Sequence, residues 1–83
     1  MTSRDDISSK VIEALTELLH LEKEKVRPES SLVEDLEMDS FNAVQLLFEL
    51  EDQYGIEIPD EQIKDFKSVQ DIIVYIEARL AQK

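Results

Sequence analysis

The sequence predicts an all-α fold: a small bundle of three main helices plus one short helix, with a long loop after the first helix. Three stretches carry apolar residues at the three- and four-residue spacing of amphipathic helices. One Gly and two Pro in 83 residues leave little that would interrupt those stretches. No repeat or linker composition divides the chain, so we expect residues 1–83 to form a single domain.

The first helix is predicted to run from Arg4 to His20. Ser3 and Asp6 have capping-box spacing, with Asp in the place usually taken by Glu. The residues that form its apolar stripe, one or two turns apart, are Ile7, Val11, Leu15 and Leu18.

Residues 21–38 are predicted to form a long loop. Pro28 prevents continuation of a helix, and Glu29-Ser30-Ser31 is typical of a turn. A loop of this length without structure is unusual in a compact domain and is often functional. The apolar side chains that should hold the loop on the core are Val26, Leu32 and Leu36.

The second helix is predicted from Ser40 to Tyr54. Asp39 is its expected N-cap, and Gly55 is expected to end it in a left-handed conformation. Ile56 is then placed to complete a Schellman motif. We interpret residues 56–58 as a packed connector, because a lone three-residue strand would have no partner to pair with.

Two further helices complete the fold. A short one is predicted over Asp60–Phe66, capped by Asp60. The last is predicted over Val69–Ala81, with Ser68 as N-cap and Asp71 at the third helical position. Its continuous apolar stripe consists of Val69, Ile72, Ile73, Ile76 and Leu80.

Negative charge is concentrated in residues 28–63, which we call the acidic block. It holds eleven Asp and Glu and no Lys or Arg, whereas the rest of the chain has nine acids and nine bases. The net charge of −11 is therefore the charge of the acidic block. Such a field steers basic partners and repels the phosphates of nucleic acid, so we expect no nucleic-acid binding.

Other features of the composition bound the function further. There is no cysteine, which excludes disulfides, a thiolate nucleophile and Cys-type metal sites. No apolar run reaches membrane-spanning length, and the first residues carry no apolar signal segment. We therefore expect a cytoplasmic protein without membrane insertion.

The second predicted helix has more apolar surface than one core face needs. Projected at about 100° per residue, its core stripe comprises Ala43, Leu46, Leu47, Leu50 and Tyr54. A second stripe, which we call the apolar strip, is centred about 130° away and comprises Phe41, Val44 and Phe48. The helix could be buried on both sides, or the strip could be an exposed partner surface inside an acidic rim. We favour the second interpretation, because the strip begins beside Ser40.

Ser40 has two interpretations of its own. A serine at a helix start is most often a cap, but Asp39 can do the capping and leave the Ser40 hydroxyl free. A nucleophilic serine needs a base within hydrogen-bond reach, and the only histidine, His20, belongs to another helix. Gly-x-Ser-x-Gly is also absent, which disfavours a hydrolase. A serine that another enzyme modifies needs no base of its own.

The carboxylates before Ser40 are similar to a calcium-binding loop but do not match one. Ser40 stands where the loop needs Gly after Asp39, and Leu46 stands at the position of the bidentate Glu. We expect no dedicated metal site and interpret the carboxylates as a solvated acidic face.

The chain as a whole resembles the acyl carrier proteins. Asp39-Ser40 is common by itself, but it is specific when followed at this distance by residues 50–59, which read LEDQYGIEIP. The resemblance covers the first helix, the long loop, the acidic second helix, the short helix and the last helix.

This resemblance implies a function for individual residues. Ser40 would carry a covalent 4′-phosphopantetheine arm, whose thiol holds acyl groups as thioesters, and Asp39 would help organise Mg²⁺ when the arm is transferred from coenzyme A. The chain itself would not be an enzyme. The positions that match the family's partner contacts are Phe41, Val44, Phe48, Glu51 and Asp52.

The implied partners are a carrier-protein synthase, which is a phosphopantetheinyl transferase, and acyl-transferring or condensing enzymes with basic surfaces. We expect the carrier to be a monomer. Its pathway would be fatty-acid, polyketide or related lipid biosynthesis.

Some residues depart from the family pattern. Phe41 replaces the commoner Leu, Asn42 and Gln45 replace acids, and Glu37-Met38 replaces a pair that frequently contains Gly. These departures favour a specialised carrier over the main fatty-acid carrier. Two alternatives stay open: an aminoacyl carrier, for example for D-alanine, and an unmodified acidic helical adaptor that makes no use of Ser40.

Overall fold

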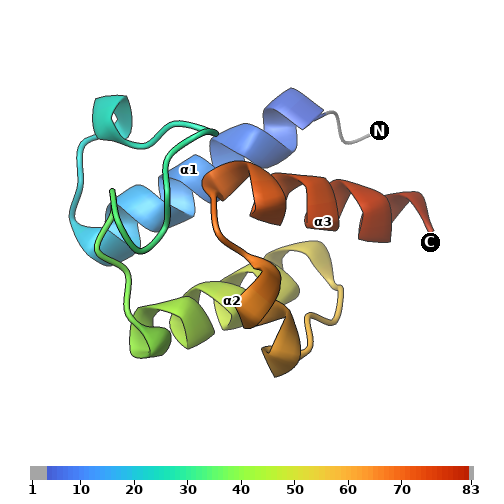
Figure 1. The fold of residues 1–83 in the computed structure, drawn as a ribbon. Helices are drawn as coiled ribbons and strands as arrows, with labels where there is room; N and C mark the ends of the chain where they lie inside the picture. Colours follow the sequence, from blue (N-terminus) through green and yellow to red (C-terminus); the bar gives the residue numbers. More distant parts are fainter. Residues whose placement is uncertain (1–3, 83) are drawn as a thin grey trace.

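The computed structural model describes residues 4–82 and shows the predicted all-α bundle (Figure 1). Within this part of the chain there is no strand, only one isolated antiparallel bridge between Ser31 and Ser68. The helical elements in chain order are α1 (Arg4–Leu19), the 3₁₀ turn η1 (Lys23–Lys25), α2 (Ser40–Tyr54), the 3₁₀ helix η2 (Asp60–Asp65) and α3 (Val69–Ala81).

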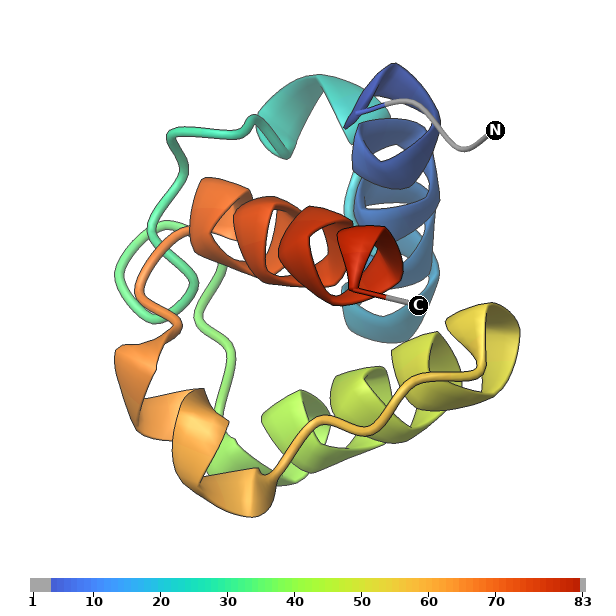
Figure 2. The same ribbon diagram turned by 90° about the vertical axis from the view of Figure 1, so that its right-hand side faces the viewer.

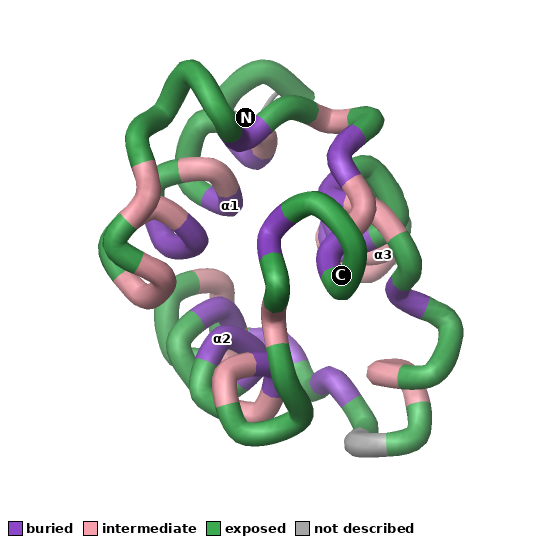
Figure 3. Tube along the Cα trace, turned by 60° about the vertical axis from the view of Figure 1, so that its left-hand side comes forward, coloured by how far each residue is buried: buried purple, intermediate pink, exposed green. Residues whose placement is uncertain are grey.

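The three long helices enclose one core. Both α2 and α3 pack against α1, and η2 lies beside α2 (Figures 1 and 2). Buried residues face inward from all three helices, and the loop and the connector add further ones (Figure 3). The largest fully buried side chains are Ile7, Leu15, Leu32, Leu46, Leu50, Ile72, Ile76, Val11 and Val69.

The end of α1 differs from the prediction by one residue. His20 was expected inside the helix, but its φ of 57° is left-handed, and the Leu21 N–H donates to the Thr16 carbonyl at 3.0 Å. This hydrogen bond spans five residues and closes the helix as a Schellman motif does, with His20 in the place that Gly usually takes. The predicted cap Ser3 lies outside the described residues.

The loop between α1 and α2 is more ordered than a structureless connection. Besides η1 it holds a hydrogen-bonded turn at residues 31–36, and its predicted anchors Val26, Leu32 and Leu36 are all buried. The Val69 N–H donates to the Ser30 carbonyl at 3.1 Å, and the Gln70 N–H donates to the Pro28 carbonyl at 2.8 Å. The loop therefore satisfies amide groups that the first turn of α3 cannot pair by itself.

Ser68 caps α3 as predicted, and with Asp71 it forms a capping box. The Ser68 hydroxyl accepts from the Asp71 N–H at 3.3 Å, and the Asp71 carboxylate accepts from the Ser68 N–H at 3.1 Å. Further along α3, Glu77 forms an exposed ion pair with Arg4 of α1. The hydrogen bonds from Arg4 hold the pKa of the Glu77 carboxyl below its usual value.

The end of α2 and the connector have the structure that the sequence predicts. Gly55 has a φ of 64°, and the Ile56 N–H donates to the Glu51 carbonyl at 3.3 Å, as expected for a Schellman motif. Ile56 and Ile58 are buried, which confirms the packed connector. Burial, assisted by the charge of Asp6, raises the pKa of the Tyr54 hydroxyl at the end of α2.

The short helix starts at Asp60 as predicted, but it differs in type, in its cap and by one residue at its end. The element η2 is a 3₁₀ helix, with the Gln62 N–H donating to the Pro59 carbonyl at 2.9 Å. Pro59 occupies the cap position and Asp60 is the first helical residue, so the prediction that Asp60 caps the helix was wrong. Six residues fit the tighter 3₁₀ geometry that short helical pieces often take.

The two stripes of α2 have different environments. Ala43, Leu46, Leu47 and Leu50 are buried, and Tyr54 is half-buried. Within the apolar strip, Phe41 is 71% exposed and Phe48 is 63% exposed, while Val44 is half-buried. The interpretation that α2 is buried on both sides is therefore wrong.

A pair of substitutions on α2 tests this difference. Leu50→Ala should lower the free energy of unfolding by about 2–5 kcal/mol, because it leaves a cavity in the core. Phe48→Ala should cost less than about 1 kcal/mol, since changes at exposed positions have small effects. Denaturant midpoints measure both values. Equal losses for the two variants would contradict the exposed position of Phe48.

Candidate functional site

Ser40 is positioned by the cap of α2. The Asp39 carboxylate accepts a hydrogen bond from the Asn42 N–H at 2.8 Å, and Asp39 itself is extended (φ −100°, ψ 179°). The helix therefore begins at Ser40, whose side chain is exposed. Among residues 4–82 no side-chain hydrogen bond engages the Ser40 hydroxyl. This confirms that Asp39 caps the helix and leaves that hydroxyl free.

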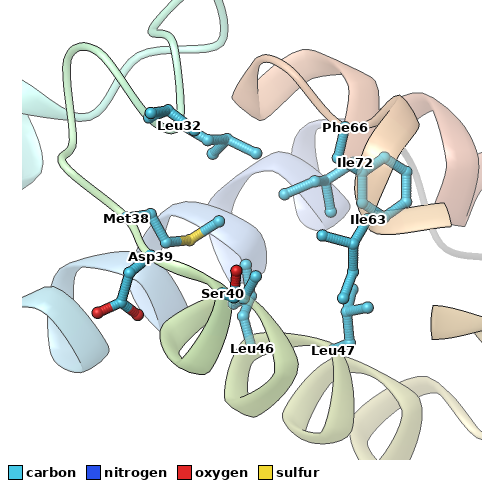
Figure 4. Close-up of a pocket in the computed structure, with 11 residues that line it drawn as sticks. Leu32, Met38, Asp39, Ser40, Leu46, Leu47, Ile63, Phe66 and Ile72 are labelled. Carbon is cyan, nitrogen blue, oxygen red and sulfur yellow. The ribbon is translucent and has the colours of Figure 1, made fainter. Parts of the chain in front are cut away.

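Beside Ser40 lies an apolar cavity of about 420 Å³, within the range typical of small-molecule sites (Figure 4). Its walls come from the loop, α2, η2 and α3. The residues that line it are Leu32, Val33, Met38, Asp39, Ser40, Ala43, Leu46, Leu47, Ile63, Phe66 and Ile72.

One wall of the cavity is held in place by aromatic packing. The Phe66 ring lies edge-on to the Tyr75 ring, with centroids 5.5 Å apart and planes at 72°. The Tyr75 hydroxyl donates in turn to the Glu57 carbonyl at 3.5 Å. The Phe66 ring, just after η2, is therefore held by Tyr75 of α3, which is itself held by the connector residue Glu57.

The cavity offers little to a polar group. Among the described residues that line it, Asp39 alone is charged, and Figure 4 shows the Asp39 carboxylate directed away from the apolar side chains. Burying an unpaired polar or charged group there would cost several kcal/mol, roughly 2–7 for an amide or hydroxyl. The cavity therefore suits an apolar occupant.

Uncompensated carboxylates surround this site. The one salt bridge found among the described residues joins Arg4 and Glu77, both outside the acidic block. Near Ser40, the exposed Glu37 has a φ of 54°, a conformation that glycine adopts most easily. The chain thus keeps a carboxylate at a position where the backbone favours Gly.

The remaining predicted contact residues lie on the outer surface of α2. The apolar strip starts next to Ser40, and Glu51 (half-buried) and Asp52 (exposed) follow about three turns later. His20, in contrast, lies at the end of α1. No cluster of three or more His, Cys, Asp or Glu that could hold a metal ion occurs among the residues described.

Sequence reasoning did not single out four of the residues that line the cavity. Val33, Met38, Ile63 and Phe66 come from irregular segments or from the short η2, where no helical period marks which side chains face inward. The only available signal was their apolar character within polar surroundings.

Comparison with known proteins identifies the family. The phosphopantetheine attachment site family matches residues 9–76. The acyl carrier protein of Thermosynechococcus vestitus is 39% identical over 79 residues, covering 95% of this chain and 98% of the relative. Those of Rickettsia canadensis and Rickettsia typhi are 40% identical, covering 95% of this chain and 92% of each relative. This chain belongs to the acyl carrier protein family.

Family membership confirms the resemblance seen in the sequence and explains the site. The chain is an acyl carrier, and its prosthetic group is 4′-phosphopantetheine. Members of this family are generally not enzymes. The N-terminus of α2 fits the group, because free amide groups and the helix dipole favour a phosphodiester there.

Proposed function

We propose that Ser40 carries the 4′-phosphopantetheine arm and that the chain presents acyl groups to partner enzymes without catalysing a reaction itself. The observation that supports this most directly is the exposed Ser40 hydroxyl, which Asp39 leaves free at the rim of an apolar cavity. When bound, the arm supplies a terminal thiol that holds acyl groups as thioesters.

Attachment needs chemistry that this chain only partly provides. The Ser40 Oγ attacks the β-phosphorus of coenzyme A, the new phosphodiester forms, and adenosine 3′,5′-bisphosphate leaves. The hydroxyl proton passes to a base of the transferase, because among the described residues no hydrogen bond joins the Ser40 hydroxyl to a basic group. Asp39 would help to hold Mg²⁺ during this transfer, through the carboxylate oxygen Oδ2 that does not accept from the Asn42 N–H.

The cavity distinguishes an acyl from an aminoacyl cargo. An aliphatic chain would gain about 0.8 kcal/mol for each methylene buried there. The ammonium of an aminoacyl group would find no partner among Leu46, Leu47, Ile63, Phe66 and Ile72. We therefore propose that the cavity shelters an aliphatic acyl chain, which disfavours the aminoacyl carrier.

The surface of α2 supports the proposed partners. The exposed Phe41 and Phe48 lie in the acidic block, so a complementary enzyme presents an apolar contact within a basic rim. Such enzymes include the transferase and the acyl-transferring or condensing enzymes of lipid biosynthesis. An unmodified adaptor would use the same strip but leaves the free serine beside a cavity unexplained.

The proposal extends to the compartment in which the carrier acts. No helix in the described part of the chain is long and apolar enough to cross a bilayer. We propose that residues 1–83 act as one carrier domain in the cytoplasm, where coenzyme A is available for arm transfer.

The site is tested by intact mass. Incubation with coenzyme A, Mg²⁺ and a carrier-protein synthase should add one phosphopantetheine to the wild type and none to Ser40→Ala. Modification of the Ser40→Ala variant would show that the site is wrong.

Asp39→Asn is a useful companion variant. Asparagine caps helices about as well as aspartate, so the unfolding midpoint should change little. The rate of arm transfer should still fall, because the charge that helps to hold Mg²⁺ is lost. Wild-type transfer rates in this variant would remove Asp39 from the proposed role.

Shelter of the cargo is tested by thermal unfolding. An octanoyl thioester on the arm should raise stability by about 2 kcal/mol or more over the unloaded form, because several methylenes become buried. An alanyl thioester should not. Ile63→Gln, which places an amide in the cavity lining, should abolish the octanoyl effect. An equal gain from both cargoes would contradict shelter in the cavity.

Charge steering is tested by the salt dependence of association with the synthase. The association rate should fall as ionic strength rises, since exposed charges are screened beyond about 10 Å at 0.1 M. Glu51→Gln with Asp52→Asn should slow association at low salt. The control is Glu13→Gln with Glu17→Gln, which removes two exposed charges from α1. Equal slowing in both double variants would show that only net charge matters.

A further inference from the structure

We propose that the turn at residues 31–36, which we call the Val33 turn, is a second docking element, and that it contacts the enzyme that transfers the arm onto Ser40. This inference rests on the proposed attachment at Ser40. It adds to the apolar strip of α2 a contact on the other side of the cavity, from a loop residue, Val33, that no sequence pattern marked.

Val33 is exposed although the two leucines of the same turn are buried. Its side chain is 66% exposed, whereas Leu32 is 1% and Leu36 is 4% exposed. The two leucines anchor the turn in the core, and Val33 projects outward between them. Among the described residues, the exposed large hydrophobic side chains are Val33, Phe41, Phe48 and Val74, and the first three belong to the acidic block.

The Val33 turn is held in one shape by its own hydrogen bonds. The Asp35 carboxylate accepts from the Ser31 N–H at 2.7 Å, and the Ser31 hydroxyl accepts from the Glu34 N–H at 3.2 Å. The Asp35 and Leu36 N–H groups both donate to the Ser31 carbonyl, at 3.0 and 3.1 Å. A contact residue held this way loses little conformational entropy on binding, which favours affinity.

The turn also lies next to the attachment site. Val33 and Ser40 line the same cavity, and the Met38 N–H donates to the Leu32 carbonyl at 2.9 Å, which folds the chain back between them. In arm transfer the Ser40 Oγ itself reacts, so the transferase must bring its catalytic groups and coenzyme A up to Ser40. It therefore covers this rim of the cavity. Enzymes that act on the thiol at the far end of the arm need not do so.

Charge indicates what kind of surface the transferase presents here. Glu34, Asp35, Glu37 and Asp39 are exposed around the turn, and the acidic block holds no Lys or Arg. The complementary surface is a small apolar socket for Val33 with Lys or Arg at its rim. The transferred group is the phosphopantetheine of coenzyme A, with adenosine 3′,5′-bisphosphate leaving and the Ser40 proton passing to the enzyme.

The experiment measures kcat and KM for the unloaded carrier in arm transfer, with a carrier-protein synthase, coenzyme A and Mg²⁺. Val33→Thr keeps the shape of the side chain and adds a hydroxyl. KM should rise roughly tenfold with kcat little changed, because the hydroxyl would be buried without a partner. The separate variant Val33→Ile should keep KM within about twofold of the wild-type value, since its side chain is still apolar.

Val74→Thr is the matched control, because Val74 is also exposed (42%) but lies on α3, outside the acidic block. It should leave KM unchanged. The unfolding midpoints of the Val33 variants should stay near that of the wild type, because Val33 buries little surface. Using the unloaded carrier keeps any effect of Val33 on a cargo in the cavity out of the measurement.

The outcomes separate this inference from the proposed function. A wild-type chain that accepts no arm would overturn both. A modified wild type with the same KM for Val33→Thr would overturn the docking role of the Val33 turn alone. The same conclusion follows if Val74→Thr raises KM as much as Val33→Thr, or if Val33→Ile raises it equally.

Discussion

The hydrogen bond from the Asn42 N–H to the Asp39 carboxylate fixes where α2 begins, and the rest of the site depends on that start. It makes Ser40 the first helical residue, while the apolar stripe of α2 determines which side of the helix faces the core. The left-handed Gly55 fixes the other end. With both ends set, the helix has one rotation in which the leucines are buried and the two phenylalanines stay outside.

Function and stability make opposite demands on the acidic block. Eleven carboxylates without an intervening cation repel one another, which weakens a domain of only 83 residues. The same charge would attract the basic surfaces that we propose for the partner enzymes, with a strength that depends on the salt concentration. The fold compensates with a continuous core that reaches from α1 through the loop to α3, so the charged residues lie on its surface.

Local sequence signals predicted what depends on local geometry. The caps Asp39 and Ser68, the terminator Gly55 and the stripes of the long helices were predictable, because each acts within one or two turns. The left-handed conformation of His20 and the 3₁₀ form of η2 were not predictable, since packing decides how a helix ends and which form a short helix takes. The cavity and the exposure of Val33 depend on segments brought together by the whole fold, so neither follows from periodicity.

The hydrogen bonds between the loop and the start of α3 limit where the chain can be cut or extended. The carbonyl groups of Pro28 and Ser30 accept hydrogen bonds from the N–H groups of Gln70 and Val69, and the Leu32 N–H donates to the Lys67 carbonyl. Segments about forty positions apart in sequence are thus joined by one network of backbone hydrogen bonds. A proteolytic nick or an insertion there would release the start of α3 and open the cavity wall at Ile72. Despite its irregular course, this loop is a poor place to splice in a tag, a linker or a second domain.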